Sequence, residues 1–128
     1  MSCAIGRVIK TENNNVFGKS SGTSGPVELN DGNFQSFVSS SKLSVIDMWA
    51  AWCAPCRYLS PVVDELSKEY ANVANFGKVN VDENPVTSRN YRIESIPTIL
   101  FFKNGKAVDM SIGVVPKEVL AQKIKSLA

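Results

Sequence analysis

Hydrophobic and polar positions along the chain divide it into a polar first stretch and a patterned remainder. Residues 1–25 contain runs rich in Asn, Ser and Gly and carry few groups to bury, which is typical of a flexible tail. From residue 26 onward, apolar positions recur with the spacings of strands and helices. We therefore expect a tail over residues 1–25 and a single folded domain over residues 26–128.

The first half of this domain alternates strand and helix signals. A short strand at residues 27–29 should precede a helix with an apolar face, which Asn30 or Asp31 would cap. Residues 43–51 form a nearly continuous apolar run, as expected of a central strand that is covered on both faces. A longer helix should follow over residues 53–70, because apolar side chains recur there at helical spacing.

The second half continues the alternation and then adds a hairpin. Asn104-Gly105 is the strongest turn signal in the chain, because these two residues readily adopt the positive φ of a tight hairpin. Pro116 should open a final helix. The other expected elements are a strand at 76–81, a short helix at 84–90, a strand at 98–102 and a returning strand at 107–112. The order βαβαβαββα predicts the α/β class with a mixed sheet.

Length and composition limit the chain to one ordinary domain. Its 128 residues are 44% hydrophobic, enough for a single core. The longest apolar stretch, residues 96–102, is far shorter than the roughly 20 residues of a membrane-spanning helix. Residues 1–10 lack the apolar stretch of a secretory signal. We therefore expect a cytoplasmic protein that does not associate with membranes.

Charge and histidine content exclude several classes of function. The chain has 14 basic and 12 acidic residues, a net charge of only +2, so we expect no nucleic-acid partner. It contains no histidine. A hydrolase of the Ser-His-Asp or Cys-His type is therefore excluded, and so is any histidine-based metal site.

The chemistry points to Cys53 and Cys56, which lie where the predicted buried strand passes into a helix. The first turn of a helix has free N–H groups and a partial positive charge, which stabilise a thiolate on Cys53. Cys53 is therefore the expected nucleophile, at the exposed start of the helix. Cys56, one turn further on and beneath the surface, should be the resolving thiol. Pro55 is tolerated because the N–H it lacks would have no intrahelical acceptor.

Two structural roles for the cysteines remain possible alternatives. A zinc site would need four ligands, and only the distant Cys3 could join Cys53 and Cys56. A purely structural disulfide across so short a loop would constrain the unfolded chain little. A redox role is favoured over both of these interpretations, and we expect Cys3 to take no part in the chemistry.

Several motifs in a fixed order resemble those of the thioredoxin family. The resemblance covers about residues 26–128 and implies a three-layer fold, with a central mixed β-sheet flanked by helices. Departures from the family pattern are Ala54 in place of the commonest Gly, Arg57 in place of the usual Lys, and the tail with Cys3. The matching segments are residues 45–57, Pro61, residues 78–82, Asn84-Pro85, residues 95–98, residues 102–105 and Gly113.

Asp47 is unusual because an acid within an apolar strand must be desolvated, which should raise its pKa. The resemblance implies that this carboxyl relays a proton, through water, for the buried cysteine, with Lys78 close by. Two alternatives stay open at this point. Asp47 could face solvent at the end of its strand, and Lys78 could be an ordinary exposed strand lysine.

The resemblance also implies a substrate-binding surface around the dithiol. It implies a cis peptide bond between Ile96 and Pro97, packed against the dithiol, which leaves the backbone of Ile96 free to pair with an extended substrate segment. The other implied contributors are Trp52, Ala54, Pro55 and Gly113. A trans proline at the start of a strand, and a tryptophan buried only for packing, are the alternatives.

The function implied by the resemblance is reversible reduction of protein disulfides in cytosolic redox homeostasis. No bound cofactor or metal is expected, and the electron donor would be thioredoxin reductase or a similar enzyme; we expect a monomer. Two other functions are weighed against it. An oxidase or isomerase is disfavoured because Pro55 precedes Cys56, where oxidising relatives usually have histidine. A binding module with an incidental dithiol would not require the buried acid Asp47.

Overall fold

The computed structural model describes residues 25–128, so the expected tail, with Cys3, lies outside the described residues apart from Gly25. The elements follow one another in the predicted order βαβαβαββα. The strands are β1 (Val27–Leu29), β2 (Leu43–Trp49), β3 (Asn75–Asn80), β4 (Thr98–Lys103) and β5 (Lys106–Ile112). The helices are α1 (Phe34–Ser39), α2 (Ala54–Glu69), α3 (Pro85–Asn90) and α4 (Lys117–Leu127).

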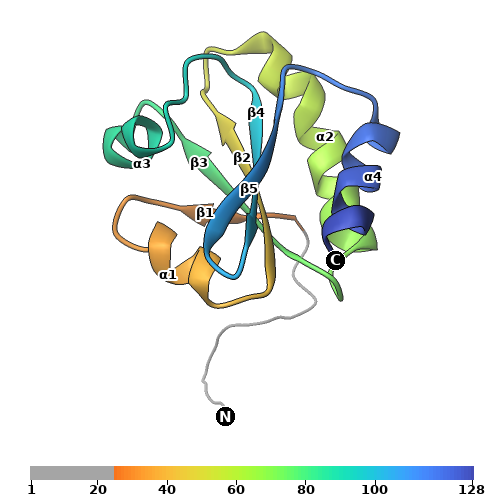
Figure 1. Cartoon of the computed structure of the whole chain (residues 1–128). Helices are drawn as coiled ribbons and strands as arrows, with labels where there is room; N and C mark the ends of the chain where they lie inside the picture. The colour runs from red at the N-terminus through yellow and green to blue at the C-terminus, as the bar shows by residue number, and fades with distance from the viewer. Residues whose placement is uncertain (1–24) are drawn as a thin grey trace.

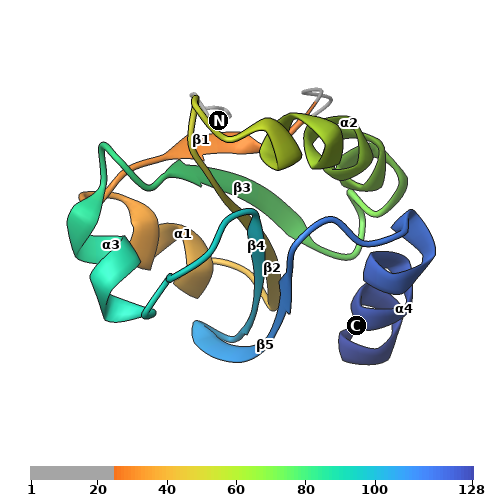
Figure 2. The same ribbon diagram turned by 90° about the horizontal axis from the view of Figure 1, so that it is seen from above.

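The strands form one mixed sheet in the order β1-β3-β2-β4-β5. The three strands β1, β3 and β2 are parallel, whereas β4 runs antiparallel to β2 and to β5. Helices α2 and α4 cover one face of the sheet, and α1 and α3 cover the other (Figures 1 and 2). This arrangement confirms the expected three-layer α/β fold and places β2 in the centre.

Strand β2 is buried on both faces, as its apolar run predicted. Leu43 and Val45 pack into the core beneath α2 and α4. Ile46 and Met48 pack into the core beneath α1 and α3. Because side chains alternate along a strand, Asp47 lies on the same side as Val45, facing the layer of α2 and α4.

The hairpin between β4 and β5 also follows its sequence signal. Asn104 and Gly105 have φ values of 53° and 85°, as a two-residue turn of this type requires. The register shifts between Phe101 and Phe102, which pair with Asp109 and Ala107, so that Val108 has no partner on β4. This bulge lies in the edge strand β5, away from the buried centre of the sheet.

The loop after β1 corrects one expectation. Neither Asn30 nor Asp31 is the N-cap residue of α1, which is Asn33. Asp31 accepts hydrogen bonds from the N–H and the hydroxyl of Thr87, at 2.9 and 2.7 Å, in the first turn of α3. Asn30 instead closes the turn before α1, accepting from the N–H groups of Gly32 and Asn33. The contact of Asp31 spans 56 residues of sequence, so it depends on strand order and not on a local signal.

Candidate active site

The dithiol lies at the junction of β2 and α2, with Cys53 as the N-cap residue of the helix. Cys53 and Cys56 form a disulfide, and their Cα atoms are 5.3 Å apart. The backbone N–H of Cys56 donates to Cys53 Sγ at 3.2 Å. A free amide of the first helical turn therefore points at the Cys53 sulfur, which is the arrangement that stabilises a thiolate there.

Exposure does not distinguish the two cysteines, contrary to expectation. Cys53 is 3% exposed and Cys56 is 4% exposed. Trp49, Val81 and Ile96 pack against the cluster that contains both cysteines, and the Ile96 carbonyl oxygen lies 3.7 Å from Cys53 Sγ. In this disulfide-bonded form the two sulfurs therefore do not differ in access to solvent. They differ in that Cys53 Sγ accepts a hydrogen bond from the backbone amide of Cys56.

The segment around Pro97 packs against the dithiol. The peptide bond between Ile96 and Pro97 is cis, as the resemblance implied. Gly113 donates its N–H to the Pro97 carbonyl at 2.8 Å. Gly113 has a φ of +87°, a conformation that glycine adopts at no steric cost. The structure thus brings together Ile96-Pro97 and Gly113, which the resemblance placed in a binding surface, although they come from two separate segments.

Trp52, Ala54 and Pro55 lie exposed around the same sulfur atoms. Trp52 is 68% exposed, so the alternative in which it is a core residue is wrong. An exposed aromatic side chain beside a reactive group provides a large surface for contact with a partner at little conformational cost.

Two hydrogen bonds hold the turn that carries Cys53, and sequence reasoning missed both. The indole N–H of Trp52 donates to Asp82 Oδ2 at 2.8 Å, and the Arg57 guanidinium donates to the Ala51 carbonyl at 2.9 Å. A signal for the first existed, because Asp82 directly follows a predicted parallel strand and such strand ends meet at one edge of a sheet. No comparable signal in the sequence indicated the hydrogen bond from Arg57 to the Ala51 carbonyl.

Asp47 is buried beside this junction. It is only 4% exposed, and its Oδ1 has no hydrogen-bond partner among the described residues. Burial raises the pKa of Asp47 to about 7; the positive charge of Lys78 opposes this change and the charge of Asp64 adds to it. The alternative in which Asp47 faces solvent is therefore wrong.

Lys78 is the register partner of Asp47 on β3 and is intermediate between buried and exposed. Its ammonium lies 5.6 Å from the centre of the Trp49 ring, within the range of a cation–π contact. Trp49 itself is partly buried against the two cysteines. The Lys78 ammonium thus lies near the Trp49 ring and acts on the buried acid through its charge. Lys78 is therefore not the ordinary exposed strand lysine of the alternative interpretation.

Within residues 25–128, no group of three or more His, Cys, Asp or Glu side chains is placed to hold a metal ion. Cys53 and Cys56 are bonded to each other. The third cysteine of the zinc alternative, Cys3, lies outside the described residues.

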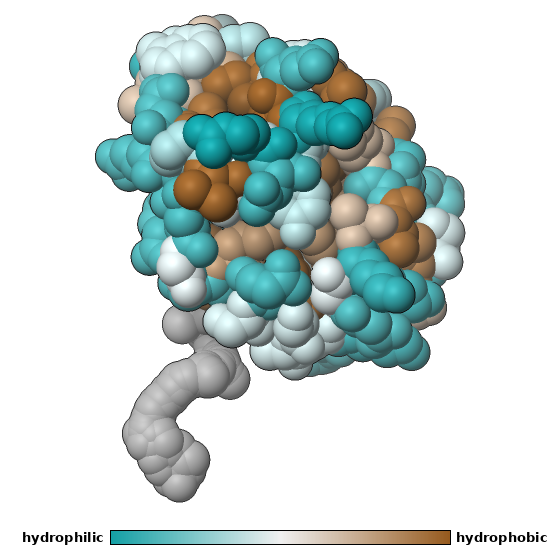
Figure 3. Space-filling model, turned by 60° about the vertical axis from the view of Figure 1, so that its left-hand side comes forward, coloured by the Kyte–Doolittle hydropathy of each residue, from teal (hydrophilic) through white to brown (hydrophobic). Residues whose placement is uncertain are grey.

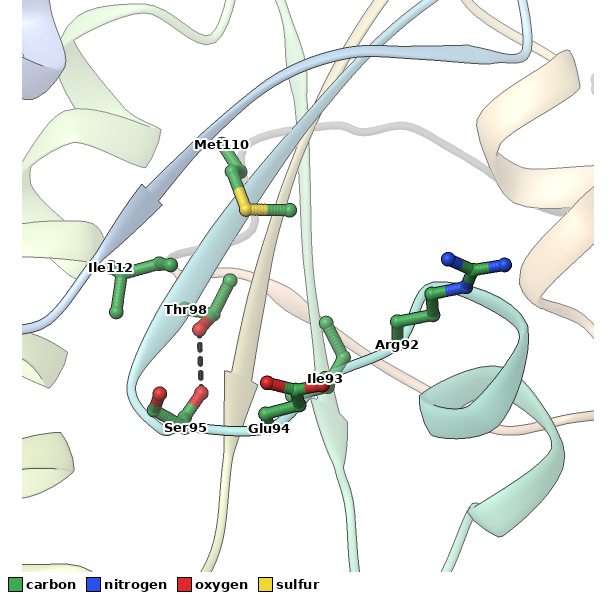
Figure 4. A pocket seen from close by; sticks show the side chains of 7 residues that line it. All are labelled: Arg92, Ile93, Glu94, Ser95, Thr98, Met110 and Ile112. Carbon is green, nitrogen blue, oxygen red and sulfur yellow. Dashed lines mark hydrogen bonds between the residues drawn. The ribbon is translucent and has the colours of Figure 1, made fainter.

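Exposed apolar residues away from the dithiol include Val108, Met110 and Ile112 on the edge strand β5. On the face shown in Figure 3, hydrophobic residues form separate patches divided by hydrophilic side chains. A pocket of about 250 Å³ lies between the segment before Pro97 and the edge strand β5. At one side of this pocket the Thr98 hydroxyl donates a hydrogen bond to the backbone carbonyl of Ser95 at 2.6 Å (Figure 4). Met110 and Ile112 form the other side. Neither cysteine lines the pocket, so it adjoins the dithiol site without containing it.

Comparisons with known proteins agree with the geometry. A family model described as thioredoxin matches residues 25–126. Thioredoxin 2 of Chlorobaculum tepidum is 48% identical over 98 residues, which cover 76% of this chain and 90% of that protein. The chloroplastic M-type thioredoxin of Pisum sativum is also 48% identical over 98 residues, covering 76% of this chain and 57% of that protein. A solved mutant thioredoxin from Halobacterium salinarum superposes with a TM-score of 0.77 at 26% identity, covering 85% of this chain and 96% of that one.

The buried carboxyl should make stability depend on pH. Because the folded-state pKa of Asp47 is raised from 3.8 to about 7, the unfolded chain releases this proton first as pH rises. The oxidised protein should therefore lose stability, relative to Asp47→Ala, between about pH 4 and about pH 7, by roughly 4 kcal/mol in total. Urea unfolding at a series of pH values measures this difference. Glu118→Gln, on the exposed side of α4, serves as the control, and a pH-independent difference for Asp47→Ala would contradict the assignment.

Proposed function

The chain belongs to the thioredoxin family, and we propose that its reduced Cys53–Cys56 pair acts with Cys53 as nucleophile and Cys56 as resolving thiol. It is a thiol-disulfide oxidoreductase that reduces protein disulfides. One observation carries this function: the family's cysteine pair is bonded at the N-terminus of α2. The helix amide that points at Cys53 Sγ supports Cys53 as the attacking sulfur.

The reaction transfers two electrons to the substrate. The Cys53 thiolate attacks one sulfur of a substrate disulfide; that bond breaks, a mixed disulfide forms, and the other substrate sulfur leaves as a thiolate that takes up a proton. Cys56 then loses its proton and attacks Cys53 Sγ, which releases the second substrate sulfur and leaves the Cys53–Cys56 disulfide. A two-electron donor, thioredoxin reductase or a similar enzyme, restores the dithiol.

Asp47 is the proposed acceptor of the Cys56 proton, through water. Its raised pKa of about 7 supports this role, because both protonation states are then populated near neutral pH. A further support is that Asp47 is buried and, by alternation along β2, faces the side of the sheet covered by α2, the helix that carries Cys56. Lys78 is proposed to assist by stabilising the ionised form of Asp47.

Substrates are proposed to dock as an extended segment along Ile96, whose carbonyl lies beside Cys53 Sγ. Pro97 and Gly113 would form the floor of this surface, which the hydrogen bond between them supports. Trp52, Ala54 and Pro55 would contact the substrate from the opposite side, since all three are exposed next to Cys53.

For the cellular setting, we propose a monomer that acts in cytoplasmic electron transfer and redox homeostasis. Over residues 25–128, every helix is too short or too polar to cross a bilayer. On the face shown in Figure 3 the apolar patches are separate, which supports a monomer as far as that face is concerned, because a stable dimer buries a larger continuous surface. The Pisum sativum relative is chloroplastic, so a location in a plastid is the competing result of subcellular fractionation.

Residues 26–128 are proposed to be the whole catalytic domain, since the family match begins at residue 25. Deleting residues 1–24 should leave the urea midpoint and the rate of disulfide reduction nearly unchanged. A Cys3→Ser variant of the full chain is the matched control for the lost thiol. A large loss in the truncated protein alone would assign the first 24 residues a part in folding or catalysis.

Reduction of insulin by dithiothreitol tests the activity itself. The protein should accelerate the precipitation of reduced insulin, and Cys53→Ser should abolish the acceleration because the nucleophile is gone. Absence of any acceleration by the native protein would favour a binding module in which the dithiol is incidental.

Trapping experiments test the order of the two thiols. With Cys56→Ser, Cys53 still attacks, but the mixed disulfide is not resolved internally and should accumulate as a covalent complex. With Cys53→Ser, little complex should form. Non-reducing gel electrophoresis with a disulfide-bonded substrate measures both, and stronger trapping by Cys53→Ser would reverse the assignment.

A further inference from the structure

Three charged residues lie in register across the parallel half of the sheet. Glu28 on β1 pairs with Lys78 on β3, and Lys78 pairs with Asp47 on β2. Directly paired residues of neighbouring strands point to the same face, so the lysine lies between two acids. Figure 2 shows β3 between β1 and β2, below the layer of α2. The family resemblance assigned a place to Lys78 and Asp47 but none to Glu28.

The two acids differ sharply in their surroundings. The Glu28 side chain is 56% exposed, the Lys78 side chain is 35% exposed, and Asp47 is only 4% exposed. Lys78 Nζ lies 3.9 Å from Glu28 Oε1. Among the described residues it makes no ion pair with Asp47 within 4.0 Å, although its charge acts on that carboxyl. The lysine is therefore paired with the solvent-side acid and affects the buried acid from a greater distance.

A second contact limits where the ammonium can lie. It stays 5.6 Å from the centre of the Trp49 ring, and Trp49 follows Asp47 by two residues on the same face of β2. The lysine stem is thus held between an aromatic ring on one side and Glu28 on the other. Movement toward Asp47 would weaken the pairing with Glu28.

We propose that Glu28 is a positioning residue for the proton transfer: it holds the Lys78 ammonium toward solvent and so sets the pH range in which Asp47 accepts a proton from Cys56. This inference rests on the proposed role of Asp47. Glu28 does not touch the reacting atoms; it acts through Lys78.

The sign of the effect follows from the charges that face Asp47. These are Lys78 from β3 and Asp64 from α2, while its partner on β4 is the apolar Ile99. Removing the charge of Glu28 would let the ammonium approach Asp47 and would also remove a distant negative charge. Both changes favour the ionised form of Asp47, so it should titrate at lower pH.

The direct test is a titration of the Asp47 carboxyl by carbon NMR in the oxidised protein, where the cysteines do not titrate. Glu28→Gln should move its midpoint to lower pH by about half a pH unit, as expected for loss of one partly exposed ion pair. Glu118→Gln removes an equal charge from the exposed side of α4 and should leave the midpoint in place. No movement in Glu28→Gln, or an equal movement in Glu118→Gln, would overturn the proposal.

A double-mutant comparison tests whether the effect passes through the lysine. In a Lys78→Met background, Glu28→Gln should move the midpoint by less than half as much as it does in the native chain. An undiminished movement would show that Glu28 acts directly on Asp47 and would overturn the positioning role.

Kinetics then separate this inference from the function on which it rests. The acid limb of the pH profile for resolution of the mixed disulfide should move to lower pH in Glu28→Gln, in parallel with the NMR midpoint. It should disappear in Asp47→Asn. If the limb survives in Asp47→Asn, the proton-acceptor role of Asp47 fails; if it disappears there but stays in place in Glu28→Gln, only the role of Glu28 fails.

Discussion

The structure depends on one constraint: β2 is covered on both faces and ends directly at the helix that carries the dithiol. Coverage on both faces requires a largely apolar strand, and residues 43–49 supply it with two polar exceptions, the hydroxyl of Ser44 and the carboxyl of Asp47. The short turn after the strand then places Cys53 at the N-cap of α2, where the amide of Cys56 is free to point at its sulfur. The same burial that fixes the strand therefore fixes the position of the nucleophile relative to the helix.

The carboxyl of Asp47 is the group in β2 that fits this burial least well. An apolar residue would fit the strand better, since a buried acid opposes folding wherever the unfolded chain would ionise it. The large apolar clusters on both faces of the sheet allow the fold to tolerate that cost. A residue that weakens the strand yet faces the side of the sheet covered by the helix that carries the dithiol is the kind of exception that functional sites make to folding rules.

Much of the fold and the core of the site could be predicted because their signals are local. The apolar run of β2, the Asn104-Gly105 turn and the Cys53–Cys56 spacing each lie within a few residues, and the structure contains all three as expected. Contacts that depend on which strands are neighbours in the sheet could not be predicted from such local signals. Asp31 caps a helix that begins more than fifty residues later, Trp52 bonds to Asp82 across 30 residues, and Glu28 meets Lys78 only because β1 pairs with β3.

The equal burial of the two cysteines shows a second limit of prediction from the sequence. The sequence places Cys53 at the start of a helix, where exposure is the natural expectation, but the covering groups include Ile96 from another segment. Access to the sulfur therefore depends on the segment before Pro97, and a substrate that docked along Ile96 as proposed would lie directly beside Cys53. In the proposed mechanism, burial of the sulfur would restrict attack to partners that dock correctly, while the helix amide would keep the sulfur reactive. Selectivity and reactivity would thus come from two separate contacts on one atom, the Ile96 carbonyl on one side and the Cys56 amide on the other.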